Sequence, residues 1–143
     1  MVFNWCKSMI VFCLLIFTGS QVMAADVGKM AWDHLRSQGL SEVATAAILG
    51  NFAHESGGLE PERLQGEPAR FSKEVICDNE TGYGLAQWTS LDRQQGLAEF
   101  ARSRGKSSSD LYVQLDYARL EMQRNHPGLI DSLNAMTSVP DAT

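Results

Sequence analysis

A glutamate stands at the end of the most hydrophobic helical segment that the sequence predicts. Residues 43–52 are mostly apolar, and Glu55 follows them directly before Ser56 and two glycines. Apolar neighbours such as Phe52 and the negative end of the helix dipole both favour the protonated form of a carboxyl group there. Such an acid can donate a proton to a leaving group. Glu55 is therefore a candidate general acid, and a solvated glutamate in a last helical turn is the equally weighted alternative.

The segment from Gly82 to Trp88 (GYGLAQW) is a second candidate feature. Two glycines around Tyr83 predict a tight turn that presents an aromatic ring. Gln87 and Trp88 add an amide and a flat apolar face, a combination that suits an acetamido sugar. The alternative is that Trp88 belongs to the core and that the turn has no binding role.

Helices must position both features, since the apolar residues recur mostly at helical spacing. The first predicted helix runs from Val27 to a stop at Gly39, and the second from a cap at Ser41 to Gly57. A third begins at a cap at Thr89 or Ser90 and ends at about Arg104. A fourth runs from Leu111 to a point before Pro127, and a short fifth helix covers 129–136. Residues 59–84 lack a sustained period and contain several turn formers, which predicts a long loop with a short hairpin around Tyr83. The expected fold is therefore mostly α-helical with one long central loop.

The N-terminus predicts export from the cell. Lys7 precedes an unbroken apolar run over 9–17, and Val22 to Ala24 supplies the small side chains that a signal peptidase reads. The run is well short of the about 20 apolar residues that a membrane span needs. We therefore expect a signal peptide over 1–24 and one mature domain over 25–143. This domain would be periplasmic or secreted, and the chain would meet the membrane only through its signal peptide.

Charge and cysteine content exclude several kinds of partner. The formal charge is −5, from 12 Lys and Arg against 17 Asp and Glu, so nucleic acid is not an expected ligand. Cys77 is the one cysteine of the expected mature chain, and it therefore has no partner for an internal disulfide. His54 has no metal partners at helical spacing. We expect a monomer without metal or cofactor.

The motifs taken together resemble the phage tail lysozyme type of domain. This type belongs to the lysozyme-like superfamily, together with goose-type lysozymes and lytic transglycosylases. The resemblance extends from about Lys29 to Ala142 and rests on residues 47–51 (AILGN), 55–57 (ESG), 82–88 (GYGLAQW) and 114–117 (QLDY). It implies an α+β lysozyme-like fold in which the central loop or hairpin lines a glycan cleft.

The resemblance also implies roles for individual residues. Glu55 matches the catalytic acid of the family, and Ser56 matches the serine that orients this acid or contacts the substrate. Gln87 matches a glutamine that lines the sugar cleft, and Tyr83 and Trp88 match the aromatic positions beside it. The implied activity is cleavage of the β-1,4 bond between N-acetylmuramic acid and N-acetylglucosamine, with peptidoglycan glycan strands as the partner.

The identity of a second carboxylate stays open at this point. An inverting hydrolase needs a base about 6.5–9.5 Å from the acid, and Asp78 and Glu80 are the candidates. A lytic transglycosylase manages without one, because a hydroxyl of the substrate attacks and closes a 1,6-anhydro ring. A non-catalytic peptidoglycan-binding remnant is the remaining alternative.

The end of the chain adds an expectation about stability. The resemblance implies a further helix after the region that matches residues 138–142, and the chain ends at Thr143. Without that helix, we expect a marginally stable domain in which four apolar side chains lack part of their cover, namely Leu115, Met122, Leu129 and Leu133.

Overall fold

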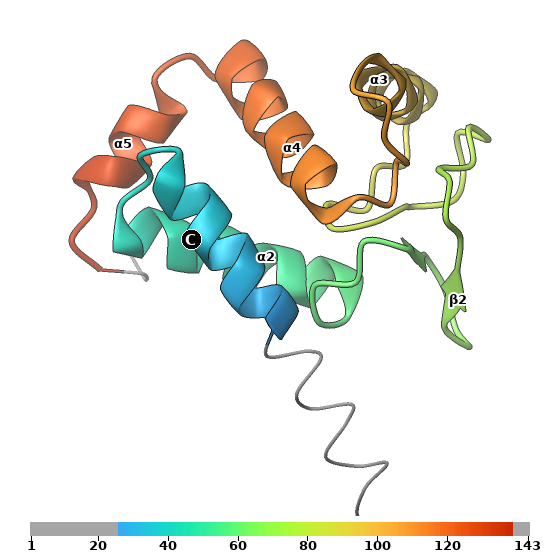
Figure 1. Cartoon of the computed structure of the whole chain (residues 1–143), viewed down its shortest axis with the longest axis horizontal. Coiled ribbons are helices and arrows are strands. Elements are labelled where there is room, and N and C mark those ends of the chain that lie inside the picture. The colour runs from blue at the N-terminus through green and yellow to red at the C-terminus, as the bar shows by residue number, and fades with distance from the viewer. Residues whose placement is uncertain (1–25, 139–143) are drawn as a thin grey trace, which may run out of the picture.

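The computed structural model describes residues 26–138, so the predicted signal peptide over 1–24 lies outside the described residues (Figure 1). A first helix over 26–37 is followed by helices α2 (Glu42–Ser56), α3 (Leu91–Ser103), α4 (Leu111–Asn125) and α5 (Leu129–Ala135). The short strands β1 (Arg63–Leu64) and β2 (Arg70–Phe71) lie between α2 and α3. The prediction of a mostly helical lysozyme-like fold is confirmed.

The two ends of α2 are set by the local signals that the sequence carries. The Ser41 hydroxyl accepts a hydrogen bond from the Ala44 N–H at 3.1 Å, which satisfies one of the free donors of the first turn. Gly57 adopts a left-handed conformation with φ 71°, and its N–H bonds to the Ala53 carbonyl. The predicted cap and stop of this helix are both confirmed, and they place Glu55 in its last turn.

The central segment contains one pair of strands in addition to the short hairpin predicted around Tyr83. Strands β1 and β2 are antiparallel, with Arg63 opposite Phe71 and Leu64 opposite Arg70. Tyr83 makes only isolated bridges, to Leu64 and to Trp88. The predicted short hairpin around Tyr83 is present as a minimal one, because Tyr83 and Trp88 exchange two backbone hydrogen bonds at 3.2 and 3.0 Å. The β1–β2 hairpin, which reverses at the turn-forming residues 66–68, was not predicted.

The core joins the helices to the segment around Tyr83. Figure 1 shows α4 between α5 on one side and α3 on the other, with the β1–β2 hairpin beyond the end of α2. The buried cluster draws on the first helix, α2, α3, α4 and the loop, and contains Ala31, Leu35, Leu40, Ala44, Ile48, Leu49, Phe52, Leu64, Tyr83, Leu85, Trp88, Leu97, Ala101, Val113, Leu115, Tyr117 and Ala118. No helix within residues 26–138 has the length and hydropathy to cross a membrane.

The four side chains expected to lack cover differ in their environment. Leu115 is only 1% exposed, so the prediction is wrong for this residue. Met122, Leu129 and Leu133 are half-buried and line an apolar groove of about 190 Å³ between α2, α4 and α5. The burial of Leu115 follows from the position of α4 against the first helix and α2, which share its apolar cluster.

A candidate glycan-cleaving site

Two buried glutamines hold the 82–88 segment in place. Gln114 of α4 accepts from the Leu85 N–H at 2.8 Å and donates to the carbonyls of Pro61 and Ser108, at 2.7 Å each. Gln94 of α3 donates to the carbonyls of Thr81 and Trp88, at 2.9 and 3.2 Å. Both side chains are fully buried. They pair backbone groups that an irregular loop would otherwise leave unsatisfied, which fixes the turn without regular strands.

The turn requires a glycine at position 84 and holds the backbone of Gln87 in a strained conformation. Gly84 has φ 67°, and a Cβ atom on it would lie 2.4 Å from Oε1 of Gln114. Gln87 also has a positive φ, 44°, which costs a non-glycine residue about 1–2 kcal/mol. Its amide donates to the Gly84 carbonyl at 2.9 Å, and the side chain is half-buried. Backbone strain of this kind clusters at functional sites, so Gln87 remains a candidate substrate contact.

The structure buries three of the side chains predicted to contact substrate. Tyr83, Trp88 and Ser56 are each 0% exposed, so none of them presents a surface to a sugar. The Tyr83 hydroxyl donates to the Ser72 carbonyl at 3.1 Å, and burial raises the pKa of Tyr83 to about 12. The reading of Trp88 as a core residue is the one that the structure supports. These residues support the site from within the core.

Ser56 acts on the position of Glu55 through the backbone. Its hydroxyl donates to the Phe52 carbonyl at 2.6 Å and accepts from the Glu60 N–H at 3.1 Å. The hydroxyl therefore ties the segment after α2 back to the helix end. This arrangement agrees with the orienting role implied for Ser56 and does not agree with direct contact to substrate.

Glu55 lies on the outside of this helix end. Its side chain is exposed, whereas Phe52, one turn earlier, is buried. Among residues 26–138, the Glu55 carboxylate has no hydrogen-bond or ion-pair partner. The apolar surroundings expected for this carboxyl group are therefore wrong for the free protein, because Phe52 points into the core and Glu55 points to solvent.

An open cleft of about 390 Å³ lies between the two elements that carry Glu55 and Gln87, although neither of these side chains lines it. It is formed by α2, the 82–88 turn, α3 and α4, and is lined by Phe52, Ala86, Arg93, Ala118, Glu121, Met122, Asn125 and His126. Phe52 precedes Glu55 by one helical turn, and residues three apart lie on neighbouring parts of a helix surface. Ala86 directly precedes Gln87. The cleft thus brings α2 and the turn, which carry the two candidate residues, to one place.

The carboxylate of Glu121, which the sequence did not predict as part of the site, lies in the wall of this cleft. Both oxygens of Glu121 receive hydrogen bonds from Arg93, at 2.8 Å from Nε and 2.9 Å from Nη2. The buried indole of Trp88 donates to the same carboxylate at 2.7 Å. The hydrogen bond to Glu121 raises the pKa of Arg93 above its usual value. No local pattern links residues on α3 and α4, so the sequence offered no signal for this cluster.

The two candidates for a second carboxylate have different surroundings. Asp78 accepts from the Thr81 hydroxyl at 2.6 Å, and from the N–H groups of Thr81 and Glu80 at 2.8 and 2.9 Å. These hydrogen bonds hold the pKa of Asp78 well below its usual range, which makes it a weak base. Glu80 is exposed, and its carboxylate has no partner within residues 26–138. Asp78 therefore stabilises the loop, and Glu80 is the better candidate for a base.

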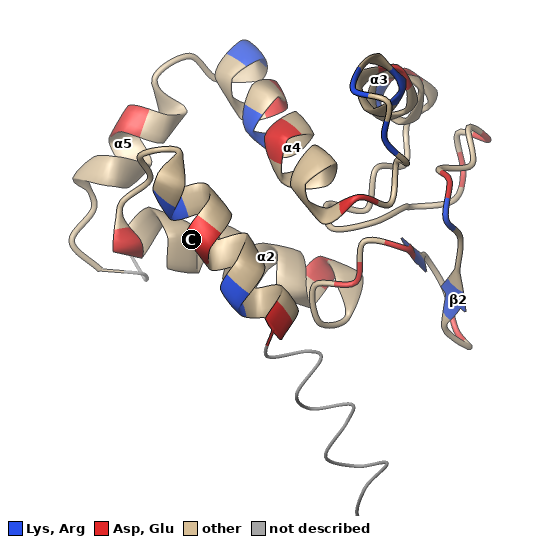
Figure 2. Cartoon of the chain, viewed as in Figure 1, with Lys and Arg blue, Asp and Glu red and all other residues tan. Residues whose placement is uncertain are grey.

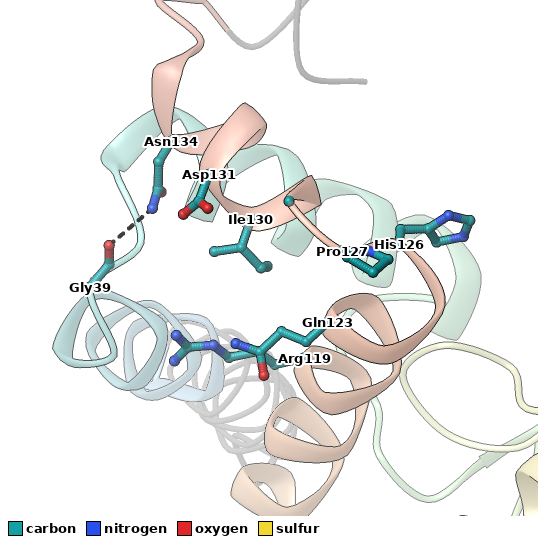
Figure 3. Close-up of a pocket in the computed structure, with 9 residues that line it drawn as sticks. Gly39, Arg119, Gln123, His126, Pro127, Ile130, Asp131 and Asn134 are labelled. Carbon is teal, nitrogen blue, oxygen red and sulfur yellow. Dashed lines mark hydrogen bonds between the residues drawn. The ribbon is translucent and has the colours of Figure 1, made fainter.

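A second, polar pocket of about 510 Å³ lies away from these motifs, between residue 39, α4 and α5 (Figure 3). Arg119 reaches into it from α4, and its Nη1 donates to the side chain of Gln38 at 2.9 Å. On the opposite side, Asn134 donates to the Gly39 carbonyl at 3.3 Å. None of the candidate site residues lines this pocket, and none lines the cleft. The cleft differs because its lining includes residues of α2 and of the 82–88 turn, the two elements that carry Glu55 and Gln87, so we place the candidate glycan site there.

Charge is mixed around the site. Figure 2 shows acidic and basic residues alternating along α4, and two of the acidic ones, Asp116 and Glu121, pair with His34 and Arg93. Within residues 26–138, no group of three or more His, Cys, Asp or Glu side chains has a geometry suited to a metal ion. Cys77 is exposed and unpaired in this part of the chain.

Comparison with known proteins places the chain in a family. A family model described as phage tail lysozyme matches residues 26–143. Searches of curated proteins and of solved structures find no match. The family indicates a lysozyme-like glycosidase that degrades peptidoglycan. Because the match covers nearly all of the predicted mature domain, the chain belongs to the phage tail lysozyme family.

Proposed function

We propose that this chain cleaves the β-1,4 bond between N-acetylmuramic acid and N-acetylglucosamine, with Glu55 as the general acid. The observation that carries the proposal is the position of Glu55. Its carboxyl group is exposed and unpaired among the described residues, at a helix end that Gly57 and Ser56 fix, one turn beyond the cleft residue Phe52. A proton donor must reach the glycosidic oxygen, and an exposed, positioned carboxyl group can do so.

The environment that keeps Glu55 protonated is supplied by the substrate in this proposal. A glycan strand over the exposed carboxyl group displaces water from it, and the loss of water favours the neutral form. Glu55 then donates its proton to the glycosidic oxygen as the bond from this oxygen to the sugar C1 breaks. Gln87 follows the cleft residue Ala86 in the chain, and its half-buried side chain is the proposed contact for an acetamido group of the strand.

The fate of the sugar cation separates two versions of the reaction. In a hydrolase, a base such as Glu80 takes a proton from the attacking water. In a lytic transglycosylase, a hydroxyl of the muramic acid attacks instead and gives a 1,6-anhydro end. Hydrogen bonds already occupy the carboxylates of Asp78 and Glu121, so Glu80 is the proposed base if the enzyme is a hydrolase.

Mass spectrometry of peptidoglycan after incubation with the purified protein tests the proposal. Reducing ends indicate a hydrolase and anhydro-muramic ends a transglycosylase, whereas intact glycan with bound protein indicates a non-catalytic remnant. Glu55→Gln should lower the rate about 10²–10⁴-fold and leave binding intact, since the amide keeps the shape and cannot donate this proton. Glu99→Gln is the matched control, because Glu99 is an exposed glutamate on α3 outside the cleft. A Glu55→Gln rate within a few-fold of the wild-type rate would refute the assignment.

We also propose that the protein acts as a periplasmic or secreted monomer. The N-terminal pattern over 1–24 supports this, and the peptidoglycan substrate of the family lies outside the cytoplasmic membrane. Cell fractionation and N-terminal sequencing check it, with Ala25 expected as the first residue of the exported protein. Size-exclusion chromatography checks the monomer.

A further inference from the structure

Arg93 lies in the wall of the cleft, where an ion pair with Glu121 holds it and leaves part of its guanidinium group unused. Glu121 takes one N–H from Nε and one from Nη2. A guanidinium group carries five N–H donors, so three remain. Among residues 26–138, Nη1 makes no hydrogen bond, and the side chain is 41% exposed. The free donors are therefore accessible from the cleft that Arg93 lines.

The support behind this arginine reaches into the core. Glu121 is nearly buried, and its carboxylate also accepts from the indole N–H of the fully buried Trp88. The chain from Trp88 through Glu121 to Arg93 thus fixes the guanidinium plane before any ligand arrives. A donor group fixed in advance loses little conformational entropy when a ligand binds.

The rest of the cleft suits a ligand that is partly apolar and carries an acceptor. Phe52, Ala86, Ala118 and Met122 provide apolar wall, and Asn125 and His126 provide polar groups. Unused N–H groups of an arginine are best matched by a carboxylate, because charge-assisted hydrogen bonds are stronger than neutral ones. Glu121 repels such a ligand in part, but its own charge is already shared between Arg93 and Trp88.

We propose that Arg93 binds a carboxylate group of peptidoglycan beside the glycan strand and so makes the site selective for peptidoglycan over uncharged chitin. This inference rests on the proposed function, since it places the glycan in this cleft. Peptidoglycan carries carboxylates on its stem peptides and, where the stem is absent, on the lactyl group of N-acetylmuramic acid. Chitin has the same acetamido sugar backbone and carries neither group.

A purely structural role for Arg93 predicts a different outcome. If the ion pair with Glu121 only joins α3 to α4, its loss loosens the cleft for every glycan alike. A binding role predicts a loss confined to ligands that carry a carboxylate. Comparing charged and uncharged glycans in the same binding assay separates the two roles.

The experiment uses co-sedimentation with insoluble glycans in a Glu55→Gln background, which prevents turnover. The three ligands are peptidoglycan sacculi, chitin, and the glycan strands that an amidase releases from the sacculi by removing the stem peptides. These strands are soluble, so their binding is measured by competition with the sacculi for the protein. Arg93→Gln is expected to weaken binding about tenfold to one or both peptidoglycan materials and to leave chitin binding unchanged. The material that shows the loss identifies the carboxylate as that of the peptide or that of the lactyl group.

Two further variants control the experiment. Arg93→Lys keeps the charge without the planar fork and should bind with intermediate affinity. Arg102→Gln removes an exposed arginine of α3 that does not line the cleft and should change nothing. If Arg93→Gln weakens binding to chitin and peptidoglycan equally, or weakens neither, the proposed role of Arg93 is overturned. The proposed glycan site is not affected by that result. If the Glu55→Gln protein binds none of the three ligands, the proposed glycan site itself is overturned together with the role of Arg93.

Discussion

Replacing Gly84 by alanine tests how firmly the buried amide of Gln114 fixes the turn. The new Cβ would lie 2.4 Å from Oε1, 2.7 Å from Nε2 and 2.8 Å from Cδ of Gln114. Gln114 has no room to move away, because its side chain is fully buried and its amide bonds to Pro61 and Ser108. Either the glutamine loses these hydrogen bonds or the turn shifts.

The magnitude follows from two separate penalties. A non-glycine residue in the left-handed region costs about 1–2 kcal/mol, and Gly84 has φ 67°. Crowding an extra carbon into a packed interior costs about a further 1–3 kcal/mol. We therefore expect Gly84→Ala to lower the free energy of unfolding by about 2–5 kcal/mol. A typical domain has about 5–15 kcal/mol in total, so the loss is large.

Two other glycines separate these penalties in the same protein. Gly105 has φ 62° with open space around its Cβ position, so Gly105→Ala should cost only the backbone penalty of about 1–2 kcal/mol. Gly50 lies inside α2 with open space, so Gly50→Ala should stabilise the protein by about 0.5–1 kcal/mol. Urea unfolding followed by tryptophan fluorescence measures all three variants. If Gly84→Ala costs no more than Gly105→Ala, the proposed close packing of Gln114 against the turn is incorrect.

Two further predictions concern a buried hydroxyl and an exposed carboxylate. Thr45 is fully buried on α2, and its hydroxyl has no hydrogen-bond partner within the described residues, so Thr45→Val should leave stability unchanged or raise it by about 1 kcal/mol in urea unfolding. A clear loss would show that the hydroxyl has a partner. Asp78→Asn should destabilise the protein near neutral pH, because the folded chain donates hydrogen bonds to the carboxylate and lowers its pKa below the ordinary 3.8. The stability from a lowered pKa is present above 3.8 and is lost as the pH falls below this value, so the difference between wild type and variant should shrink in acid. A difference that persists unchanged in acid would contradict this account.

Local signals in the sequence predicted the helix ends well. A serine before the apolar segment and a glycine after it are sufficient to place the ends of α2, because Ser41 and Gly57 act on backbone groups within four residues. The predicted end of α4 before Pro127 is also confirmed, since this helix ends at Asn125. The position of Glu55 in the last turn of α2 was therefore readable from the sequence alone.

The environment of the site could not be predicted in the same way. A tyrosine and a tryptophan beside glycines can face either a ligand or the core. Which of the two orientations occurs depends on contacts with side chains from distant segments of the chain. Trp88 packs against Tyr117 of α4 in the core, and Glu121 of the same helix accepts its indole N–H. The loop keeps its shape through Gln94 and Gln114, whose amides bond to residues far away in sequence. Such pairings leave no periodic pattern along the chain.

At this site, the residues that hold the backbone in place differ from the residue proposed to donate the proton. The groups that hold it in place are buried and bonded on several sides, as Ser56, Gln94 and Gln114 are. The proposed reacting group, Glu55, is exposed and contributes no contact to the core. Its conversion to glutamine should therefore leave the fold unchanged, whereas changes to the buried supports should disturb both stability and activity. In the proposed reaction a glycan strand must cover Glu55, which is open to water in the free protein, so proton donation is tied to substrate binding.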